Sequence, residues 1–150
     1  MSERPLRLIA HDREDLEVIS AHMQDCIVAV EDIVYQRRTR RFALAGSRFN
    51  WLAAEAGRME RRQTGLHFDS VLSAATGGFD PLGRKVPLNL LSIEFRPGDP
   101  PAGDILLTFS GGAAIRLAVE CIDAQLRDLG PRWQTKARPG HVDPDEIAAT

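Results

Sequence analysis

The chain has 150 residues, which is enough for one domain that buries a hydrophobic core without disulfides or metals. Hydrophobic residues make up 43% and charged residues 27% of it, which is the composition of an ordinary globular protein and excludes a largely disordered chain. The formal net charge of −2 argues against a dedicated nucleic-acid or membrane-surface protein, because such proteins are usually strongly basic.

The two cysteines and the first residues of the chain indicate a cytoplasmic protein. Cys26 and Cys121 each lie inside an apolar run, which favours two buried, reduced thiols, although a bridge between them stays open. Residues 1–15 lack the apolar segment of a secretory signal, and no apolar run is long enough to cross a bilayer. We therefore expect a cytoplasmic location and no membrane contact.

The N-terminal part of the chain predicts a short strand followed by a helix. Residues 6–9 form a brief apolar run, and Asp12 has the side chain of a helix N-cap. One apolar stripe then recurs at a spacing of three and four residues: Leu16, Ile19 and Met23. The helix is expected to end at Asp25 or Cys26.

The next segments predict a hairpin. Residues 27–35 are rich in β-branched side chains and favour a strand, and residues 36–40 are polar and favour a turn. Residues 41–51 follow as the second strand. Residues 52–63 are ambiguous, because their alanines favour a helix that Gly57 interrupts.

The apolar residues of the second strand change face along its length. Two of them fall on one face, Phe42 and Leu44. Two others fall on the opposite face, Phe49 and Trp51. This change predicts a bulge or a bend between the pairs, because one extra residue reverses the direction of every side chain that follows.

The middle of the chain predicts two further strands. Residues 65–75 and 88–95 contain alternating apolar side chains, and residues 77–85, rich in turn residues, form the loop between them. Residues 96–103 hold three prolines and two glycines and must be a connection.

A double glycine marks another hairpin. Residues 105–109 and 115–121 each alternate apolar and polar side chains, and Gly111 and Gly112 separate the two runs. Two glycines between alternating runs are typical of a tight turn between antiparallel strands.

The segment after this hairpin fits two structures. We expect the strand to end near Glu120 and a helix to run to Leu129, with Gly130 as its cap and Pro131 as its stop. The competing interpretation is one long strand that continues to Leu126.

These elements predict an α+β domain. We expect a mainly antiparallel sheet or small bent barrel with an N-terminal and a C-terminal helix, and the element order is similar to that of a pleckstrin-homology domain. Residues 1–133 form the single globular domain in this interpretation. Residues 134–150 are polar and are expected to be a mobile tail.

The sequence contains no familiar catalytic or cofactor motif. A phosphate-binding loop, a dinucleotide-binding glycine pattern, zinc-ligand spacings and a nucleophile elbow are all missing. The four histidines are scattered, and no two have metal-ligand spacing on one element: His11, His22, His67 and His141. His67 is expected to face away from the core. The sequence therefore predicts no catalytic residue, metal or cofactor, and favours a protein that is not an enzyme.

Arginines crowd the predicted hairpin turn. They are Arg37, Arg38, Arg40 and Arg41, and Arg48 follows in the next strand. Closely set guanidinium groups repel one another, so an anionic partner would stabilise them. A turn in water explains the same pattern without a partner, because salt screens charges over about 8–10 Å.

Trp133 follows the predicted helix stop. It stands next to Arg132, and Lys136 is three residues further on. The side chain is expected to cover the edge of its own core, as most tryptophans do. The alternative is that it anchors a partner, because exposed tryptophan and arginine are frequent binding hot spots.

Several short segments carry a resemblance over nearly the full length of the chain. They are residues 20–25 (SAHMQD), 41–44 (RFAL), 48–49 (RF), 66–68 (LHF), 115–117 (IRL), 120–122 (ECI) and 128–131 (DLGP) before Trp133. In these the chain resembles a family of small bacterial proteins labelled only as a domain of unknown function. The resemblance implies a compact bacterial cytoplasmic protein and no activity, cofactor or catalytic residue.

Three functions remain open. The leading hypothesis is a binding or adaptor domain that uses the arginine-rich hairpin to contact a protein partner. The second is an enzyme or binder for a small anionic, phosphorylated metabolite, with Arg48 or Arg116 holding the anion and His67 or His22 handling protons. The third is an RNA-associated protein. A homodimer formed through a sheet edge is also possible in each case.

Overall fold

The computed structural model describes residues 5–81, 83 and 86–134. The first half of the chain contains β1 (Arg7–Ala10), α1 (Arg13–Met23), β2 (Cys26–Ala29), the 3₁₀ turn η1 (Val30–Asp32), β3 (Ile33–Gln36), β4 (Arg41–Phe49) and α2 (Trp51–Glu55). The second half adds β5 (Glu60–Phe68), β6 (Val71–Gly77), β7 (Pro87–Pro97), β8 (Gly103–Phe109), η2 (Ser110–Gly112), β9 (Ala114–Val119) and β10 (Ala124–Gln134).

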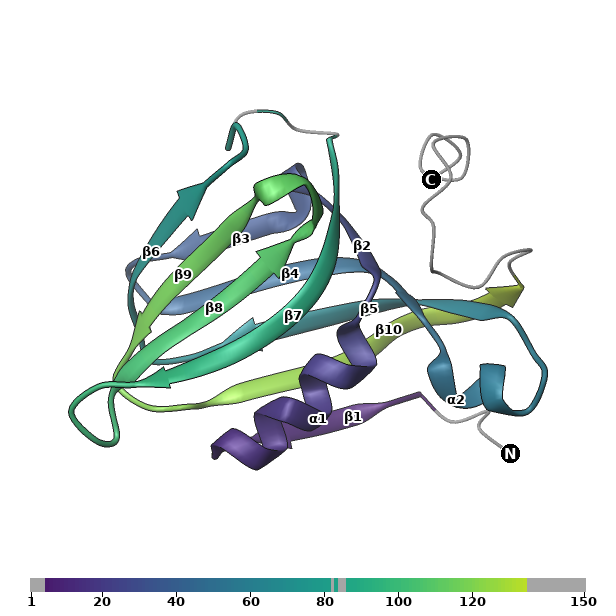
Figure 1. The fold of residues 1–150 in the computed structure, drawn as a ribbon, viewed down its shortest axis with the longest axis horizontal. Helices are drawn as coiled ribbons and strands as arrows, with labels where there is room; N and C mark the ends of the chain where they lie inside the picture. The colour runs from purple at the N-terminus through teal and green to yellow at the C-terminus, as the bar shows by residue number, and fades with distance from the viewer. Residues whose placement is uncertain (1–4, 82, 84–85, 135–150) are drawn as a thin grey trace.

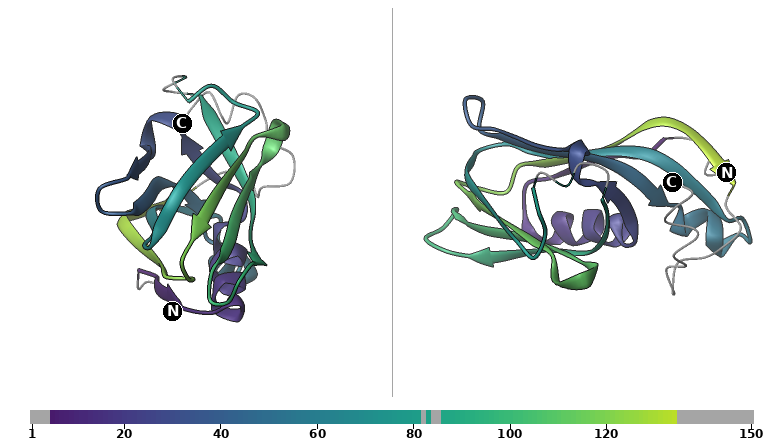
Figure 2. Two further views of the ribbon diagram at one scale, coloured as in Figure 1. Left: turned by 90° about the vertical axis from the view of Figure 1, so that its left-hand side faces the viewer. Right: turned by 90° about the horizontal axis from the view of Figure 1, so that it is seen from above.

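The ten strands of the described residues form one antiparallel sheet. Their order is β1-β10-β5-β4-β2-β7-β8-β9-β6, and β3 lies beside the first part of β4. The sheet bends so strongly that β7, β8 and β9 face β4, β5 and β10 across the hydrophobic core (Figures 1 and 2). Helix α1 packs against β7 and β1 and covers the side of the barrel that lies between these two strands.

Helix α1 confirms the helix expected near the N-terminus. The side chain of Asp12 accepts a hydrogen bond of 2.8 Å from the backbone N–H of Asp15, which caps the first turn. The predicted apolar stripe of Leu16, Ile19 and Met23 is fully buried against the sheet. The local sequence therefore determines this element almost completely.

The hairpin predicted at the double glycine is also confirmed. It joins β8 to β9, and both Gly111 (φ 75°) and Gly112 (φ 82°) adopt left-handed backbone conformations. Glycine takes this conformation without the steric cost that a β-carbon brings.

The predicted fold class is wrong in its helical part. An α+β domain with a C-terminal helix was expected, but the segment from Ala124 to Gln134 is strand β10. The structure is mostly antiparallel sheet, and α1 and α2 are the two α-helices of the described residues. The similarity to a pleckstrin-homology domain fails with the missing helix. The alternative of one long strand continuing to Leu126 is also wrong, because β9 ends at Val119 and β10 begins at Ala124 as a separate strand.

Tertiary pairing explains why β10 is a strand. It lies between two partners, β1 on one side and β5 on the other, so both of its backbone edges are hydrogen-bonded. Ala124 and Leu126 face the core, whereas Leu129, which the helical spacing placed with them, is 57% exposed. Gly130 and Pro131 fall within a register shift between β10 and β5 and so mark an irregularity in a strand.

Strand β4 does not contain the predicted bulge. Its pairing with β5 runs without a register shift from Phe42 to Phe49. Phe42 therefore faces the main core, and Phe49 faces the other side of the sheet. There its ring packs edge-on against Trp51, with 4.7 Å between the ring centroids. The apolar side chains change face along β4 because both sides of the strand are covered, and not because a residue is inserted.

Candidate functional site

A shallow groove of about 420 Å³ lies on the outer face of β3, β4, β5 and β10. We call it the outer groove. Its floor consists of small residues, Ala43, Ala45 and Gly65. Its walls carry larger side chains, among them Asp32, Val34, Arg41, His67, Gln125, Arg127 and Leu129. Small residues on neighbouring strands leave a hollow that the flanking side chains enclose.

The strand register sets the order of these side chains. Gln125 lies opposite His67, His67 opposite Ala43, and Ala43 opposite Val34, so the four form one row across the sheet. Because alternate residues of a strand face the same side, the row of Arg127 and Gly65 runs parallel to it on the same face. The groove is therefore framed by β10 on one side and β3 on the other.

Gly65 permits a close approach across the groove floor. A β-carbon at this position would lie 3.0 Å from the side chain of Leu129, which is tighter than an ordinary contact. Without that β-carbon, the exposed Leu129 side chain lies directly over the backbone of β5 and forms one end of the groove.

One end of the outer groove holds a cluster of charged and polar groups. The guanidinium of Arg41 donates two hydrogen bonds to Asp69, of 2.8 Å and 3.2 Å. Nε2 of His67 lies 3.6 Å from the same carboxylate. Partial burial lowers the pKa of His67 and the charge of Arg41 lowers it further, while Asp69 and Asp123 act in the opposite direction. The imidazole is consequently neutral at pH 7.

The other end carries two arginines directly opposite each other. Arg7 of β1 and Arg127 of β10 are paired in the register, and both side chains are exposed on the outer face. Among the residues that the structure describes, no carboxylate lies within ion-pair distance of either one. This end of the groove therefore has an unbalanced positive charge. Like charges directly opposite each other on two paired strands are also destabilising.

Two of the four arginines of the predicted hairpin form ion pairs within the protein. Arg40 donates a hydrogen bond of 2.8 Å to Glu120, and Arg41 binds Asp69 as described above. Arg37 and Arg38 lie in the exposed turn between β3 and β4. Of the four, Arg41 is the one that lines the outer groove.

Arg48, also predicted to bind an anion, is instead buried in an internal ion pair. Its side chain is 2% exposed and donates two hydrogen bonds of 2.8 Å to Asp128, whose side chain is 0% exposed. Asp128 also accepts a hydrogen bond of 2.7 Å from the backbone N–H of Leu6. Burial alone would raise the pKa of Asp128, but the hydrogen bonds from Arg48 and Leu6 outweigh it and lower the pKa.

Of the two arginines and two histidines proposed to act together, only His67 lines the outer groove. Arg48 faces the interior of the sheet, and His67, as predicted, faces outward. Arg116 lies on β9, and His22 lies on the last turn of α1, near enough to Arg48 for its charge to lower the pKa of His22. Trp133 pairs with Arg61 in the strand register, and its side chain lies outside the described part of the structure, as do His141 and the predicted tail beyond Gln134.

Sequence reasoning missed Arg7, Arg127 and the small-residue floor. Arg7 and Arg127 are 120 positions apart, and only the pairing of β1 with β10 makes them neighbours. Alternation along each strand places both arginines on the outer face, but nothing local in the sequence shows which strands pair.

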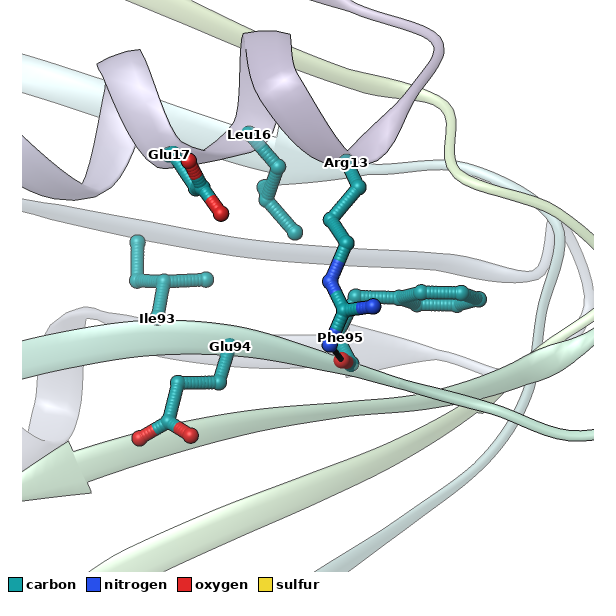
Figure 3. Close-up of a pocket in the computed structure, with 6 residues that line it drawn as sticks. All are labelled: Arg13, Leu16, Glu17, Ile93, Glu94 and Phe95. Carbon is teal, nitrogen blue, oxygen red and sulfur yellow. Dashed lines mark hydrogen bonds between the residues drawn. The ribbon is translucent and has the colours of Figure 1, made fainter.

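A second, smaller cleft of about 160 Å³ lies between α1 and β7 (Figure 3). Leu16 and Ile93 form its apolar wall, and Glu17 and Glu94 stand at its rim (Figure 3). Arg13 crosses the cleft and donates a hydrogen bond of 3.2 Å to the backbone carbonyl of Phe95. This contact attaches the start of the helix to β7, and we assign the cleft no ligand.

The family model described as "Protein of unknown function (DUF2948)" matches residues 6–141, which is most of the chain. The chain belongs to this family. No curated protein and no solved structure matches it. The resemblance identified from the sequence is therefore confirmed.

The described residues contain no group of three or more His, Cys, Asp or Glu side chains placed to hold a metal ion. None of their helices is long and apolar enough to cross a membrane.

Proposed function

We propose that this protein is a non-enzymatic binding domain and that its outer groove holds a small anionic molecule bearing carboxylate or phosphate groups. The observation that carries the proposal is the unbalanced pair of Arg7 and Arg127 beside the small-residue floor. An anion placed between two guanidinium groups would replace their repulsion with charge-assisted hydrogen bonds.

Two of the other wall residues suit the rest of such a ligand, and the carboxylate of Asp32, across the groove from β10, favours placing the anionic group beside the arginines. The neutral imidazole of His67 and the amide of Gln125 can each donate or accept a hydrogen bond. The floor of Ala43, Ala45 and Gly65 offers apolar contact without filling the space. A mostly apolar hollow with a few convergent polar groups is the usual form of a small-molecule site.

The chemistry of the walls favours binding over catalysis. No serine, threonine or cysteine is among the described residues that line the groove, so His67 has no hydroxyl or thiol there to activate. Asp69 is shared between His67 and Arg41, an arrangement that orients both side chains for recognition. The proposal differs from the hairpin hypothesis because the internal ion pairs of Arg40 and Arg41 reduce the need for an outside partner.

Titration calorimetry with inorganic pyrophosphate at low salt tests the proposal. Arg127→Gln should weaken binding about tenfold, the value of one charge-assisted hydrogen bond of about 1.5 kcal/mol. Arg116→Gln is the matched control, because Arg116 is an exposed arginine on β9, away from the groove. Ala45→Leu should also weaken binding by filling the floor without changing any charge.

The unliganded variants provide a second measurement. Arg127→Gln should leave the stability unchanged or raise it by a few tenths of a kcal/mol, because it removes the repulsion from Arg7. Equal losses of pyrophosphate binding in Arg127→Gln and Arg116→Gln would indicate non-specific attraction and refute the groove. Binding to RNA that weakens steeply with salt and survives Ala45→Leu would favour the RNA alternative.

A further inference from the structure

Strand β4 changes partner along its length, and one edge of β3 and one edge of β6 remain unpaired within the described part of the chain. The first part of β4 pairs with β3, and Ser47 near its end pairs with Ile27 of β2, the strand that leads on to β7, β8, β9 and β6. In the described structure β6 pairs with β9 alone and β3 pairs with β4 alone. The barrel is therefore incomplete between β3 and β6.

A pocket of about 210 Å³ lies at this gap, and we call it the seam pocket. Its lining is apolar apart from Tyr35 and Thr76. One side of the gap contributes Val30, Ile33, Tyr35 and Phe42, and the other side contributes Ala74, Thr76, Phe79, Pro81 and Ile115. Phe42 and Ile115 belong to the buried core, so the pocket reaches the core from the surface.

Tyr35 fixes the width of the gap at one end of β6. Its hydroxyl donates a hydrogen bond of 2.8 Å to the backbone carbonyl of Val71, the first residue of β6. The backbone N–H of Val71 also donates a hydrogen bond of 2.9 Å to the carbonyl of Arg40, in the turn between β3 and β4, so both contacts hold this end of β6. The Tyr35 hydroxyl is satisfied by its bond to Val71, so the aromatic ring contributes an apolar wall.

We propose that the seam pocket binds a small uncharged apolar molecule, with one aromatic ring or a short alkyl chain inside the barrel and any polar end near Thr76. The volume sets the size, because an apolar cavity of about 150 Å³ accommodates benzene. The lining sets the chemistry, since no charged side chain is among the residues that form the pocket.

This site is separate from the outer groove. Phe42 faces the seam pocket and the core, whereas its neighbour Ala43 faces the outer groove, so β4 divides the two sites. Their ligands also differ in chemistry, because the groove is framed by arginines. Either site can exist without the other, and their tests are independent.

Fluorobenzene and NMR provide a direct test. Tyr35 is the only tyrosine of the 150-residue chain, so selective ring-¹³C labelling places one reporter in the pocket wall. We expect saturable shifts of the Tyr35 ring signals and broadening of the ¹⁹F line, with a dissociation constant of roughly 0.1–1 mM for so small a ligand. Intermolecular NOEs between fluorobenzene and the Tyr35 ring should accompany them.

Two neighbouring alanines of β6 give a matched pair of variants. Ala74 lines the pocket, and Ala75 is exposed on the opposite face of the same strand. Ala74→Leu should weaken fluorobenzene binding at least tenfold, and Ala75→Leu should leave it unchanged. Thr76→Leu, at an exposed edge position that also lines the pocket, repeats the test if Ala74→Leu does not fold.

The proposal is overturned by any of three results. The first is the absence of a Tyr35 shift at saturating fluorobenzene. The second is equal binding to the wild-type protein, Ala74→Leu and Thr76→Leu. The third is an equal loss of binding in Ala74→Leu and Ala75→Leu, which would show that a change in β6, and not occupancy of the pocket, causes the effect.

Discussion

The ion pair between Arg48 and Asp128 gives the sharpest prediction for stability. Asp128→Ala leaves the guanidinium of Arg48 buried at 2% exposure without its partner, and it removes the acceptor of the Leu6 N–H. Removing one member of a buried pair costs about 3–5 kcal/mol, because the other charge stays uncompensated away from water. We expect a loss of about 4 kcal/mol, which for a domain of this size lowers Tm by roughly 8–16 °C.

Urea unfolding followed by circular dichroism measures this loss. Glu120→Ala is the matched control, because Arg40 and Glu120 form an ion pair at the same distance of 2.8 Å with side chains that are 56% and 52% exposed. The exposed pair should contribute less than about 1 kcal/mol. The double variant Arg48→Met with Asp128→Leu should recover part of the lost stability, because an apolar pair replaces these two charges. Recovery should be incomplete, because the buried Arg62, whose Nε lies 3.9 Å from Asp128, keeps its charge.

The comparison can fail in two ways. If Asp128→Ala costs no more than Glu120→Ala, burial does not determine the strength of these pairs and the reasoning is refuted. If the double variant is as unstable as Asp128→Ala, the loss comes from packing, from the Leu6 contact or from the charge of Arg62, and not from the uncompensated charge of Arg48.

Three further predictions concern pH, backbone contact and thiol chemistry. Burial and nearby positive charge lower the pKa of His22 in the folded state, so the unfolded protein takes up a proton more readily. The free energy of unfolding should therefore fall as the pH drops below about 6.5. His22→Gln should flatten this dependence in urea unfolding between pH 7.5 and 5. Gly46→Ala should cost about 3 kcal/mol, because the new β-carbon would lie 2.6 Å from a backbone oxygen of β2. Gly65→Ala meets only the exposed side chain of Leu129, which can shift, and should cost less than about 1 kcal/mol; equal Tm values for the two variants would contradict this. Burial raises the pKa of Cys26 to about 12, so a disulfide reagent at pH 8 should modify the folded protein at Cys121 alone, and rapid labelling of Cys26 would show that the core opens.

The elements that the sequence predicts well are those that local patterns determine. Helix α1 follows from the Asp12 cap and the stripe of Leu16, Ile19 and Met23. The β8–β9 hairpin follows from the double glycine. In both cases the deciding residues lie within a dozen positions of one another, so no knowledge of the remaining chain is needed.

The elements that the sequence predicts poorly depend on distant partners. The spacing of Ile122, Leu126 and Leu129 fits a helix, and pairing with the edges of β1 and β5 nevertheless makes the segment from Ala124 a strand, in which Leu129 faces away from Leu126. Arg48 looks like a free cation until Asp128, 80 residues away, is placed beside it. Of the outer groove, the sequence identified Arg41 and the outward direction of His67, and it missed Arg127 for the same reason.

The position of β10 has a consequence for how the chain folds during translation. β1 pairs with β10, and β5 pairs with β4 on one edge and with β10 on the other. β10 is the last strand of the described chain to be synthesised. Until β10 leaves the ribosome, β1 has no strand to pair with and one edge of β5 stays open. Such long-range pairing makes folding slow and leaves strand edges exposed to aggregation in the meantime. The nascent chain should therefore depend on chaperones, or on the delayed collapse of its core, until β10 pairs with β1 and β5.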